Sequence, residues 1–331
     1  MTNHTPRLRL VAVATSEREE LTRLQQSAIQ LGFQLDVLGL GQPWEGLGSK
    51  ITFMRTYLED APCDDMVLFL GKYDGRQWMA SPSVALESVE CHRCLRSPPM
   101  ILNGRSTANT TTTDAFDVLL LSTSSDIMAV FSSFNADLVF GAELGCAPDI
   151  GCRSLYNKPR PGQPFIYLNS GKSSRSESRS SGSRGASFSD ALFLSVVFLC
   201  VAGTYMGSAQ SIREMLAEVV LDIAEHHSFT GASKHRIDDQ RWFSRHYLRN
   251  KDKVLLDTGG KMFHTLHDVS PELLVVDEKH RGAIWSKYSQ TRPCVLHGNG
   301  NGIDSFHDVS KRLVEAGWPP EANADATTSG L

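Results

Sequence analysis

Two aspartates three residues apart are the first candidates for chemistry in this 331-residue sequence. Asp114 and Asp117 belong to the segment DAFDV, directly before an apolar run. Carboxylates bind Mg²⁺ or Mn²⁺, and the phosphates of a nucleotide sugar supply the oxygens that complete such a site. His297 ends a second apolar run, in the segment VLHGNG, and imidazole suits Mn²⁺ as a third ligand. We therefore predict a Mn²⁺ site formed by Asp114, Asp117 and His297.

Each of these signals is weak when it is taken alone. Pairs of aspartates usually lie exposed in turns, and a single histidine is more often structural than ligating. The glycines that follow His297 strengthen the prediction, since glycine lets backbone N–H groups come close to a phosphate. A metal-dependent hydrolase of nucleotide diphosphates would use the same groups and stays open as an alternative, as does a nucleotide-sugar-binding protein without activity.

The elements that would position these residues alternate between strand and helix. Apolar spacing predicts strands at 8–14, 33–38 and 66–70, and helices at 17–31 and 50–58, with Gly32 ending the first helix. Such alternation indicates an α/β sheet with parallel strands, whose ligands bind beyond the carboxyl ends of the strands. The loops after Ala14, Leu38 and Leu70 are therefore expected to form the site.

Two stretches interrupt this alternation. Residues 71–113 and 172–203 have the composition of low-complexity matter, and long loops of this kind are rare inside a domain. Both interruptions begin at a Gly-Lys pair, Gly71-Lys72 and Gly171-Lys172, whose codons can contain the intron start GTAAG. Their far ends can carry the CAG that ends an intron. We interpret both stretches as translated introns, whose removal joins MVLFL to DAFDV and YLNSG to TYMGS.

Composition excludes several classes of protein. A formal net charge of −4 argues against a nucleic-acid-binding surface, and seven scattered cysteines define no disulfide framework. The longest apolar run, 191–202, is too short to span a bilayer. The amino-terminal residues show no secretory signal, so a soluble, cytoplasmic protein is expected from the residues alone.

A set of seven motifs in order resembles the glycosyltransferase domain of procollagen lysyl hydroxylases and their stand-alone relatives. The resemblance covers residues 8–320 apart from the two interruptions, and 321–331 is expected to be a disordered tail. The motifs are LGLGQPWEGL (38–47), DAFDV (114–118), FGAE (140–143), FIYLNSG (165–171), DDQRWF (238–243), VLHGNG (295–300) and GWPP (317–320).

The resemblance implies a GT-A-like fold with a Rossmann-type mixed sheet flanked by helices, a Mn²⁺ cofactor and a UDP-sugar donor. It implies transfer of glucose or galactose to a hydroxyl acceptor, such as a hydroxylysine-linked glycan or a protein. Its catalytic residues map onto Asp238, Asp239 and Asn169. Its donor-binding residues map onto Thr15, Ser16, Trp44, Lys50, Phe116, Asn299 and Gly300.

Some features depart from the family or stay ambiguous. Ala147 replaces a family tryptophan, and the family's aspartate run is reduced to Asp238 and Asp239, which leaves the donor sugar and the acceptor open. The two aspartates could instead cap a helix, and Trp44 could be a core aromatic. We expect no hydroxylase domain after Pro320. The family is typically found in the lumen of the endoplasmic reticulum, so the compartment stays open.

Overall fold

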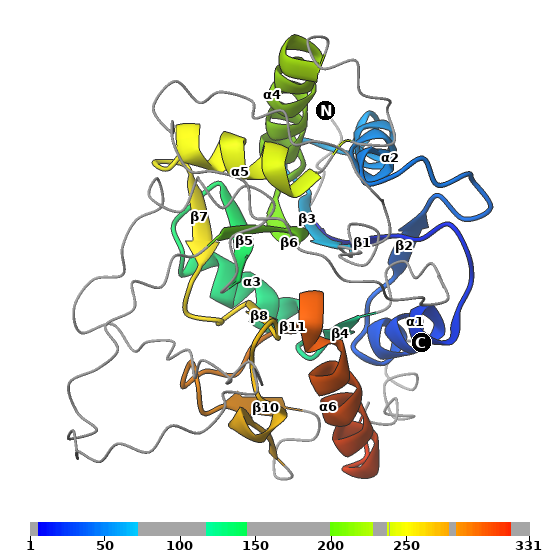
Figure 1. The fold of residues 1–331 in the computed structure, drawn as a ribbon, viewed down its shortest axis with the longest axis vertical. Helices are drawn as coiled ribbons and strands as arrows, with labels where there is room; N and C mark the ends of the chain where they lie inside the picture. Colours follow the sequence, from blue (N-terminus) through cyan, green and yellow to red (C-terminus); the bar gives the residue numbers. More distant parts are fainter. Residues whose placement is uncertain are drawn as a thin grey trace, which may run out of the picture.

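A central sheet with helices on both faces organises the computed structural model of the chain (Figure 1). The structure describes residues 6–71, 117–143, 199–227, 237, 239–277 and 283–318. Its elements follow in the order β1 (Leu8–Val13), α1 (Glu19–Gln30), β2 (Leu35–Leu38), α2 (Gly48–Leu58), β3 (Met66–Leu70), β4 (Val118–Leu120), α3 (Ser124–Ser132), β5 (Leu138–Glu143), β6 (Leu199–Ser208), α4 (Ala209–His227), α5 (Asp239–Arg249), β7 (Val254–Asp257), β8 (Phe263–Thr265), η4 (Pro271–Leu273), β9 (Leu274–Asp277), β10 (Ala283–Ser286), β11 (Val295–His297), η5 (Gly300–Gly302) and α6 (Ile303–Glu315).

The central sheet has six strands in the order β2-β1-β3-β6-β5-β7. Strand β1 is parallel to β2 and β3, and β5 is parallel to β7. Strand β6 runs antiparallel to both of its neighbours, β3 and β5. The predicted mixed sheet flanked by helices is therefore confirmed, and the expected parallel strands lie on either side of β6.

Alternation along the strands divides the core into layers. In β1, Val11 and Val13 face the cluster under α2, α4 and α5, whereas Leu10 and Ala12 face the cluster with α1. The first cluster contains a stacked pair of rings, Phe69 and Tyr205, whose centroids lie 4.6 Å apart. Burying an aromatic of this size contributes about 1.5–3 kcal/mol, so these layers hold the sheet between its helices.

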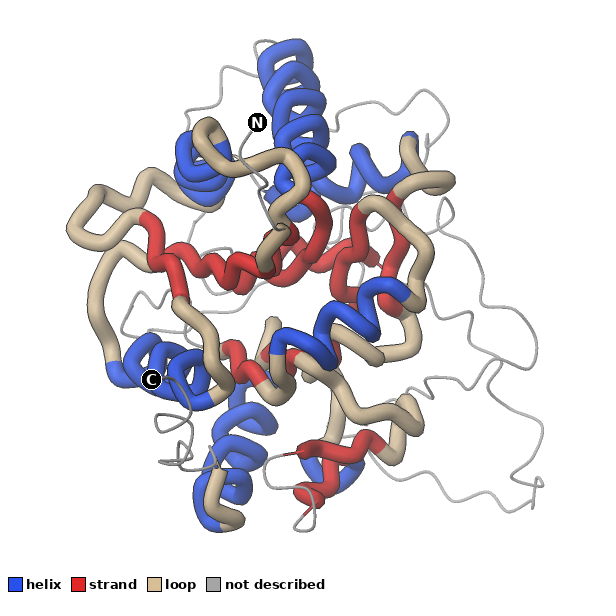
Figure 2. The backbone as a smooth tube through the Cα atoms, turned by 180° about the vertical axis from the view of Figure 1, so that it is seen from behind, coloured by secondary structure: helices blue, strands red, loops and turns tan. Residues whose placement is uncertain are grey.

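A second, three-stranded sheet lies below the central one in Figure 1, in the order β4-β11-β8. Strand β11 is antiparallel to β4 and parallel to β8. Beyond this small sheet, α6 packs on the hairpin of β9 and β10, and Figure 2 shows the same succession of layers from behind. Strand β11 is the middle strand of the small sheet, between β4 and β8.

The predicted elements of the amino-terminal part are all present. The helix expected at 17–31 is α1, followed by Gly32 in a left-handed conformation with φ of 79°, as a glycine C-cap requires. The helix expected at 50–58 begins two residues earlier, at Gly48. Helix α3 begins at a capping residue, Thr123, whose hydroxyl accepts a hydrogen bond from the backbone N–H of Asp126.

The ends of the two interruptions meet within the central sheet. Gly71 directly follows β3, and its N–H donates a hydrogen bond of 2.5 Å to the carbonyl of Gly203. Gly203 lies inside β6, which begins at Leu199, so the last five residues of the stretch 172–203 are part of this strand. Most of both stretches lies outside the described residues, and their origin as introns stays a prediction.

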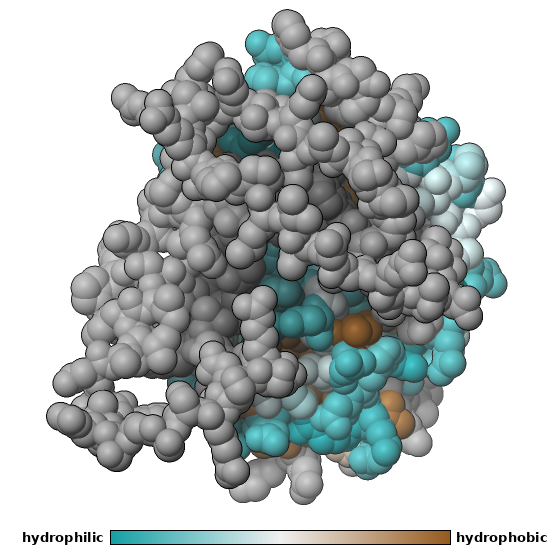
Figure 3. Space-filling view, in the orientation of Figure 1, coloured by the Kyte–Doolittle hydropathy of each residue, from teal (hydrophilic) through white to brown (hydrophobic). Residues whose placement is uncertain are grey.

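The surface of the described residues is mainly hydrophilic. Figure 3 shows this on one face, where hydrophobic positions are isolated, and the largest exposed apolar side chains are scattered over different elements. Among the described residues, no helix combines the length and apolarity needed to cross a membrane.

A buried histidine of β8 makes folding sensitive to pH. His264 donates from Nδ1 to the carbonyl of Thr265 (3.1 Å), and its Nε2 lies 2.8 Å from the hydroxyl of Ser286. The hydroxyl of Ser286 in turn accepts the N–H of Ser289, so its own proton points to the histidine. Burial lowers the pKa of His264 to about 4. This network therefore needs the neutral imidazole.

We predict that stability falls as the pH is lowered from 6.5 towards 4, since the unfolded state binds a proton that folded His264 excludes. The shift corresponds to roughly 3 kcal/mol of unfolding free energy, all of it present above pH 6.5. His264→Gln should weaken this pH dependence in urea melts, whereas His307→Gln, a change at an exposed position of α6, should retain it. Equal pH profiles for parent and His264→Gln would contradict the assignment.

Candidate active site

Polar residues from four strand ends converge where the two sheets meet. Glu143 is the last residue of β5 and His297 the last of β11, and the backbone that follows β8 passes beside them. Asp117 directly precedes β4, the antiparallel neighbour of β11. Strands that run in the same direction deliver their carboxyl ends to one edge, which explains why residues distant in sequence gather here.

Asp117 and His297 lie together at this edge. The side chains are 1% and 0% exposed, and Asp117 Oδ1 lies 3.7 Å from His297 Nε2. The register of β4 and β11 fixes the pair, and the N–H of Gly298 donates to the carbonyl of Asp117 (2.7 Å). The two predicted ligands are therefore neighbours, while their binding of a metal stays a prediction.

The geometry of the pair fits a shared divalent cation. At 3.7 Å the two atoms are too far apart for a hydrogen bond. Two ligands about 2.1 Å from one ion would lie roughly 3–4 Å apart. Asp117 Oδ1 is buried and has no hydrogen-bond partner among the residues that the structure describes, which is costly for a carboxylate unless another group binds it.

A glycine of β6 makes room for the imidazole. A Cβ atom at Gly203 would lie 2.4 Å from Cε1 of His297 and 2.5 Å from the carbonyl oxygen of Gly71. Both contacts are closer than real atoms allow, so only glycine fits between the imidazole and the end of β3. The ends of both interruptions, Gly71 and Gly203, thus lie directly beside the candidate metal ligand.

Glu143 connects three of the motifs. Its carboxylate is 8% exposed and accepts a hydrogen bond from Gln240 Nε2 of α5. It also accepts one from Asn299 Nδ2 (2.5 Å), and Asn299 Oδ1 accepts the N–H groups of Leu266 and His267 (3.1 Å each). The motif FGAE alone assigns no role to Glu143, although a carboxylate at the end of a buried strand is a signal that a sequence can carry.

Lys50 and Asp239 form a buried ion pair. Lys50 Nζ lies 3.0 Å from Asp239 Oδ2, with side chains 5% and 0% exposed, and Asp239 Oδ1 accepts the N–H of Gln240. Lys50 belongs to the first turn of α2 and Asp239 to the start of α5, so the pair joins α2 to the motif DDQRWF. Lys50 was expected to bind the donor and Asp239 to be catalytic, and the structure brings the two side chains together.

The residues expected to bind the nucleotide lie at the end of β1 and in the loop that follows β2. Thr15 is half-buried and Ser16 exposed, and the carbonyl of Thr15 accepts the N–H of Gly41, which ties the two loops together. Trp44 is partly buried and packs against the cluster under α2, α4 and α5, which agrees with the core-aromatic interpretation. Their contacts with a donor stay predictions.

The turn after His297 is shaped by close packing. Gly300 has a φ of 59°, and a Cβ there would lie 2.3 Å from Nδ1 of His267. The turn leads into α6, a 13-residue helix whose N-cap Gly302 offers no side-chain hydrogen bond to the first N–H groups. The side chain of Asn299 points into the protein, towards Glu143, and its proposed contact with a diphosphate is untested.

Several predicted residues lie outside the described part of the chain. These are Asp114, Phe116, Asn169 and Asp238, together with Ala147. Their assignments as metal ligand, nucleoside contact and catalytic residues remain predictions.

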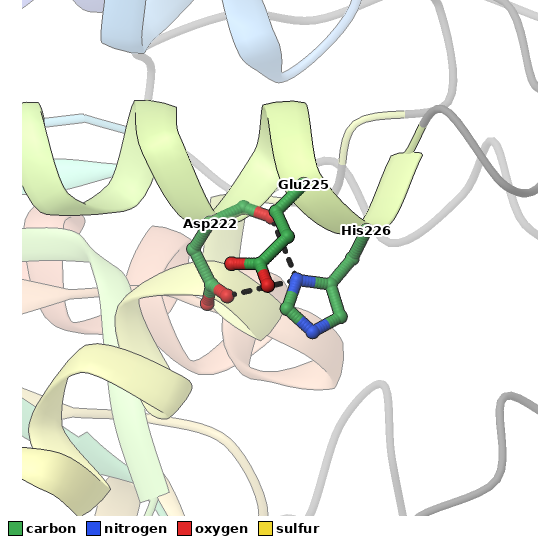
Figure 4. A group of neighbouring side chains, drawn as sticks. All are labelled: Asp222, Glu225 and His226. Atoms are coloured by element: carbon green, nitrogen blue, oxygen red, sulfur yellow. Dashed lines mark hydrogen bonds and ion pairs between the residues drawn. The ribbon is translucent and has the colours of Figure 1, made fainter.

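One group of three described side chains elsewhere could hold a metal by proximity alone. Asp222, Glu225 and His226 lie at the carboxyl end of α4 (Figure 4). Asp222, however, accepts hydrogen bonds from Arg245 and Arg249 of α5. Burial alone would raise the pKa of Asp222, but the two guanidinium groups hold it below its ordinary value. This cluster fastens α4 to α5 and needs no cation.

The fold and the site define an α/β protein of the GT-A type, with its polar residues where the mixed central sheet meets the small sheet. Residues 4–83 and 195–322 match the family described as the PLOD GT domain, and the chain belongs to this family. The interval between the two matched parts contains both Asp117 and Glu143.

Individual relatives agree with the family. The multifunctional procollagen lysine hydroxylase and glycosyltransferase LH3 of Rattus norvegicus is 23% identical over 328 residues, 95% of this chain and 32% of that protein. The procollagen-lysine,2-oxoglutarate 5-dioxygenase of Drosophila melanogaster is 24% identical over 314 residues, 90% of this chain and 31% of that protein. The uncharacterized protein R699 of Acanthamoeba polyphaga mimivirus is 25% identical over 189 residues, 56% of this chain and 30% of that protein. The chain thus spans about a third of the length of these relatives.

We predict that Lys50→Met destabilises the protein by about 3–5 kcal/mol, because it leaves the carboxylate of Asp239 buried without its cation. The double variant Lys50→Met/Asp239→Asn should be less destabilised than the single one, as denaturant melts can measure. Lys311→Met, which removes an exposed ion pair with Glu315, serves as the control and should cost less than about 1 kcal/mol. Additive effects at positions 50 and 239 would show that the pair is not coupled.

Proposed function

We propose that the chain is a Mn²⁺-dependent glycosyltransferase that moves a hexose, glucose or galactose, from a UDP-sugar to a hydroxyl group. The acceptor would be a hydroxylysine-linked glycan or a protein. Membership of the PLOD GT domain family supports the class of reaction. The observation that carries the metal and donor part is the buried pair of Asp117 and His297, 3.7 Å apart at the edge where ligands of α/β sheets bind.

Asp117 and His297, with Asp114, would hold the cation on the donor. A bound divalent cation offsets the negative charge that builds on a departing diphosphate. The uncapped amino terminus of α6 lies directly after the turn that contains Gly300, and its N–H groups would stabilise the same charge. The binding of the diphosphate is thus assigned to groups that are already fixed in place.

Asp239 would act at the sugar. Its side chain is fully buried, and its ion pair with Lys50 and its hydrogen bond from the N–H of Gln240 fix the direction of the carboxylate. A carboxylate held in this way can accept hydrogen bonds from sugar hydroxyl groups and stabilise positive charge on the sugar ring. Asp238 and Asn169 would complete this side of the site.

A donor screen tests the proposal directly. UDP release is measured in Mn²⁺ for UDP-glucose and UDP-galactose, with and without hydroxylated peptides and glycans. Release that depends on an acceptor supports a glycosyltransferase. Equal release without any acceptor would indicate a hydrolase, and binding of the donor without release would indicate a binding protein, so either result contradicts the proposal.

We predict that Asp117→Ala abolishes Mn²⁺-dependent binding of UDP in calorimetry, because the change removes a metal ligand whose buried Oδ1 has no hydrogen-bond partner among the described residues. His297→Ala should weaken the same binding less, since water can replace an imidazole. Asp308→Ala, at a surface position of α6, is the matched control and should bind like the parent. Unchanged UDP affinity in Asp117→Ala would remove Asp117 from the site.

The position of the junction glycines supports the interpretation of the two interruptions as introns. Excision of 71–113 would leave three residues, 114–116, between Leu70 and Asp117, and the end of β3 already lies beside His297 and hence near Asp117. Excision of 172–203 would put Gly171 in the place of Gly203, so that glycine is kept there. Asn169 would then take the place of Val201, which pairs with Gly141 next to the site.

We predict that a protein without residues 71–113 and 172–203 is more stable and transfers faster than the full chain. The reason is geometric, since metal ligands must keep their places to within about 0.5 Å. Melting temperature and UDP release compare the two proteins, and sequencing of the messenger RNA tests the origin of the stretches. Mature transcripts that contain both stretches, together with an inert shortened protein, would contradict the intron interpretation.

A further inference from the structure

The carboxylate of Glu143 is surrounded by donors from two different parts of the site. One oxygen, Oε1, accepts from Gln240 in the first turn of α5, and the other, Oε2, accepts from Asn299 in the turn after β11. Both donors are at least 98% buried. A carboxylate only accepts hydrogen bonds, so each amide must present its nitrogen to Glu143 and its oxygen elsewhere.

The orientation of Asn299 has a consequence for the loop after β8. With its nitrogen on Glu143, Asn299 has its oxygen free to accept the N–H groups of Leu266 and His267, and both bonds are present. If the amide turned over, its NH₂ group would face these two donors. The N–H of Leu266 would keep its second acceptor, the carbonyl of His297 (2.9 Å), but the N–H of His267 would lose the amide oxygen it binds, at a cost of about 1–3 kcal/mol. Glu143 therefore fixes this loop through Asn299.

The orientation of Gln240 has a corresponding consequence for the other side of the site. Gln240 follows Asp239, and its backbone N–H binds Asp239 Oδ1, while Asp239 Oδ2 pairs with Lys50. One continuous series of contacts thus leads from Lys50 through Asp239, Gln240, Glu143 and Asn299 to the turn next to His297. It joins the half of the site assigned to the sugar with the half assigned to the metal and the diphosphate.

From this series we infer that Glu143 is a positioning residue that sets the two halves of the site relative to each other. This inference rests on the proposed function for the identity of the halves. Both oxygens of Glu143 accept hydrogen bonds from protein amides, so Glu143 can act on the two halves of the site through Gln240 and Asn299. Activity should therefore depend on which partner of each pair donates the hydrogen bond. A carboxylate at position 299 can then replace the one at position 143, provided that every donor still faces an acceptor.

An exchange of acceptor and donor tests this directly. Asn299→Asp puts two carboxylates against each other and should lower kcat by about 100-fold, the effect of a misplacement of roughly 1 Å. Adding Glu143→Gln rebuilds the series in reverse: the new carboxylate at 299 accepts from Leu266, His267 and the amide at 143, whose oxygen accepts from Gln240. The double variant should return to within about tenfold of the parent.

Single changes at Glu143 complete the experiment. Glu143→Ala should lower kcat as Asn299→Asp does, with a smaller change in KM. Glu143→Gln alone should be milder, because Gln240 can turn its amide over. Glu214→Gln changes an exposed carboxylate of α4 that also accepts from a glutamine, Gln210, and should leave kcat unchanged.

Hydrogen exchange separates this inference from the proposed function. The backbone amide of His267 should exchange faster in Asn299→Asp and Glu143→Ala, and return to the parental rate in the double variant. The amide of Leu266 should change less, because it also donates to the carbonyl of His297. The exchange measurement does not require turnover. If the parent protein binds no UDP, the proposed function is contradicted, and the exchange rates still test whether Glu143 positions Asn299. The inference is overturned if the double variant is no better than Asn299→Asp in exchange and in kcat, or if Glu143→Ala turns over at the parental rate.

Discussion

The hydrogen-bond ladder of β6 with β3 and β5 is the interaction that joins the two halves of the molecule. Strands β1, β2 and β3 form one parallel group and β5 and β7 another, and β6 pairs with both groups along its length. Tyr205 on this strand stacks on Phe69 of one group and contacts Phe140 of the other. Loss of these pairings would separate the two groups of strands, and the edge at which the site assembles would no longer exist.

The requirement that buried polar groups find partners explains how the site is held at that edge. Glu143, Asn299, Lys50 and Asp239 are all nearly inaccessible, and each is bound by another member of the site or by backbone. A buried polar group that loses its partner costs about 1–3 kcal/mol, and a buried charge costs more. Each of these side chains is therefore held in position by the hydrogen bonds or ion pairs of its neighbours. Asp117 and His297 differ, because the distance between them leaves room for a ligand.

Local patterns in the sequence predicted the amino-terminal elements and the meeting of Asp117 with His297. Periodicity and the glycine after α1 are local signals, and the ordered motifs supplied the pairing of DAFDV with VLHGNG. The place of β6 could not be predicted in this way, since β3 pairs with residues more than 130 positions further along the chain. The partners of Glu143 and the ion pair of Lys50 with Asp239 could not be predicted either, because only the assembled sheet decides which buried polar groups meet.

The central claim is that Asp117 and His297 share a divalent cation that binds the diphosphate of a nucleotide. Anomalous diffraction from crystals grown with Mn²⁺ and UDP measures this directly, because the signal locates manganese independently of the protein atoms. The account predicts a single strong peak within coordination distance of Asp117 and His297, in contact with the diphosphate of UDP. Manganese at Asp222, Glu225 and His226 with none at Asp117, or UDP bound at the site without manganese, would contradict it.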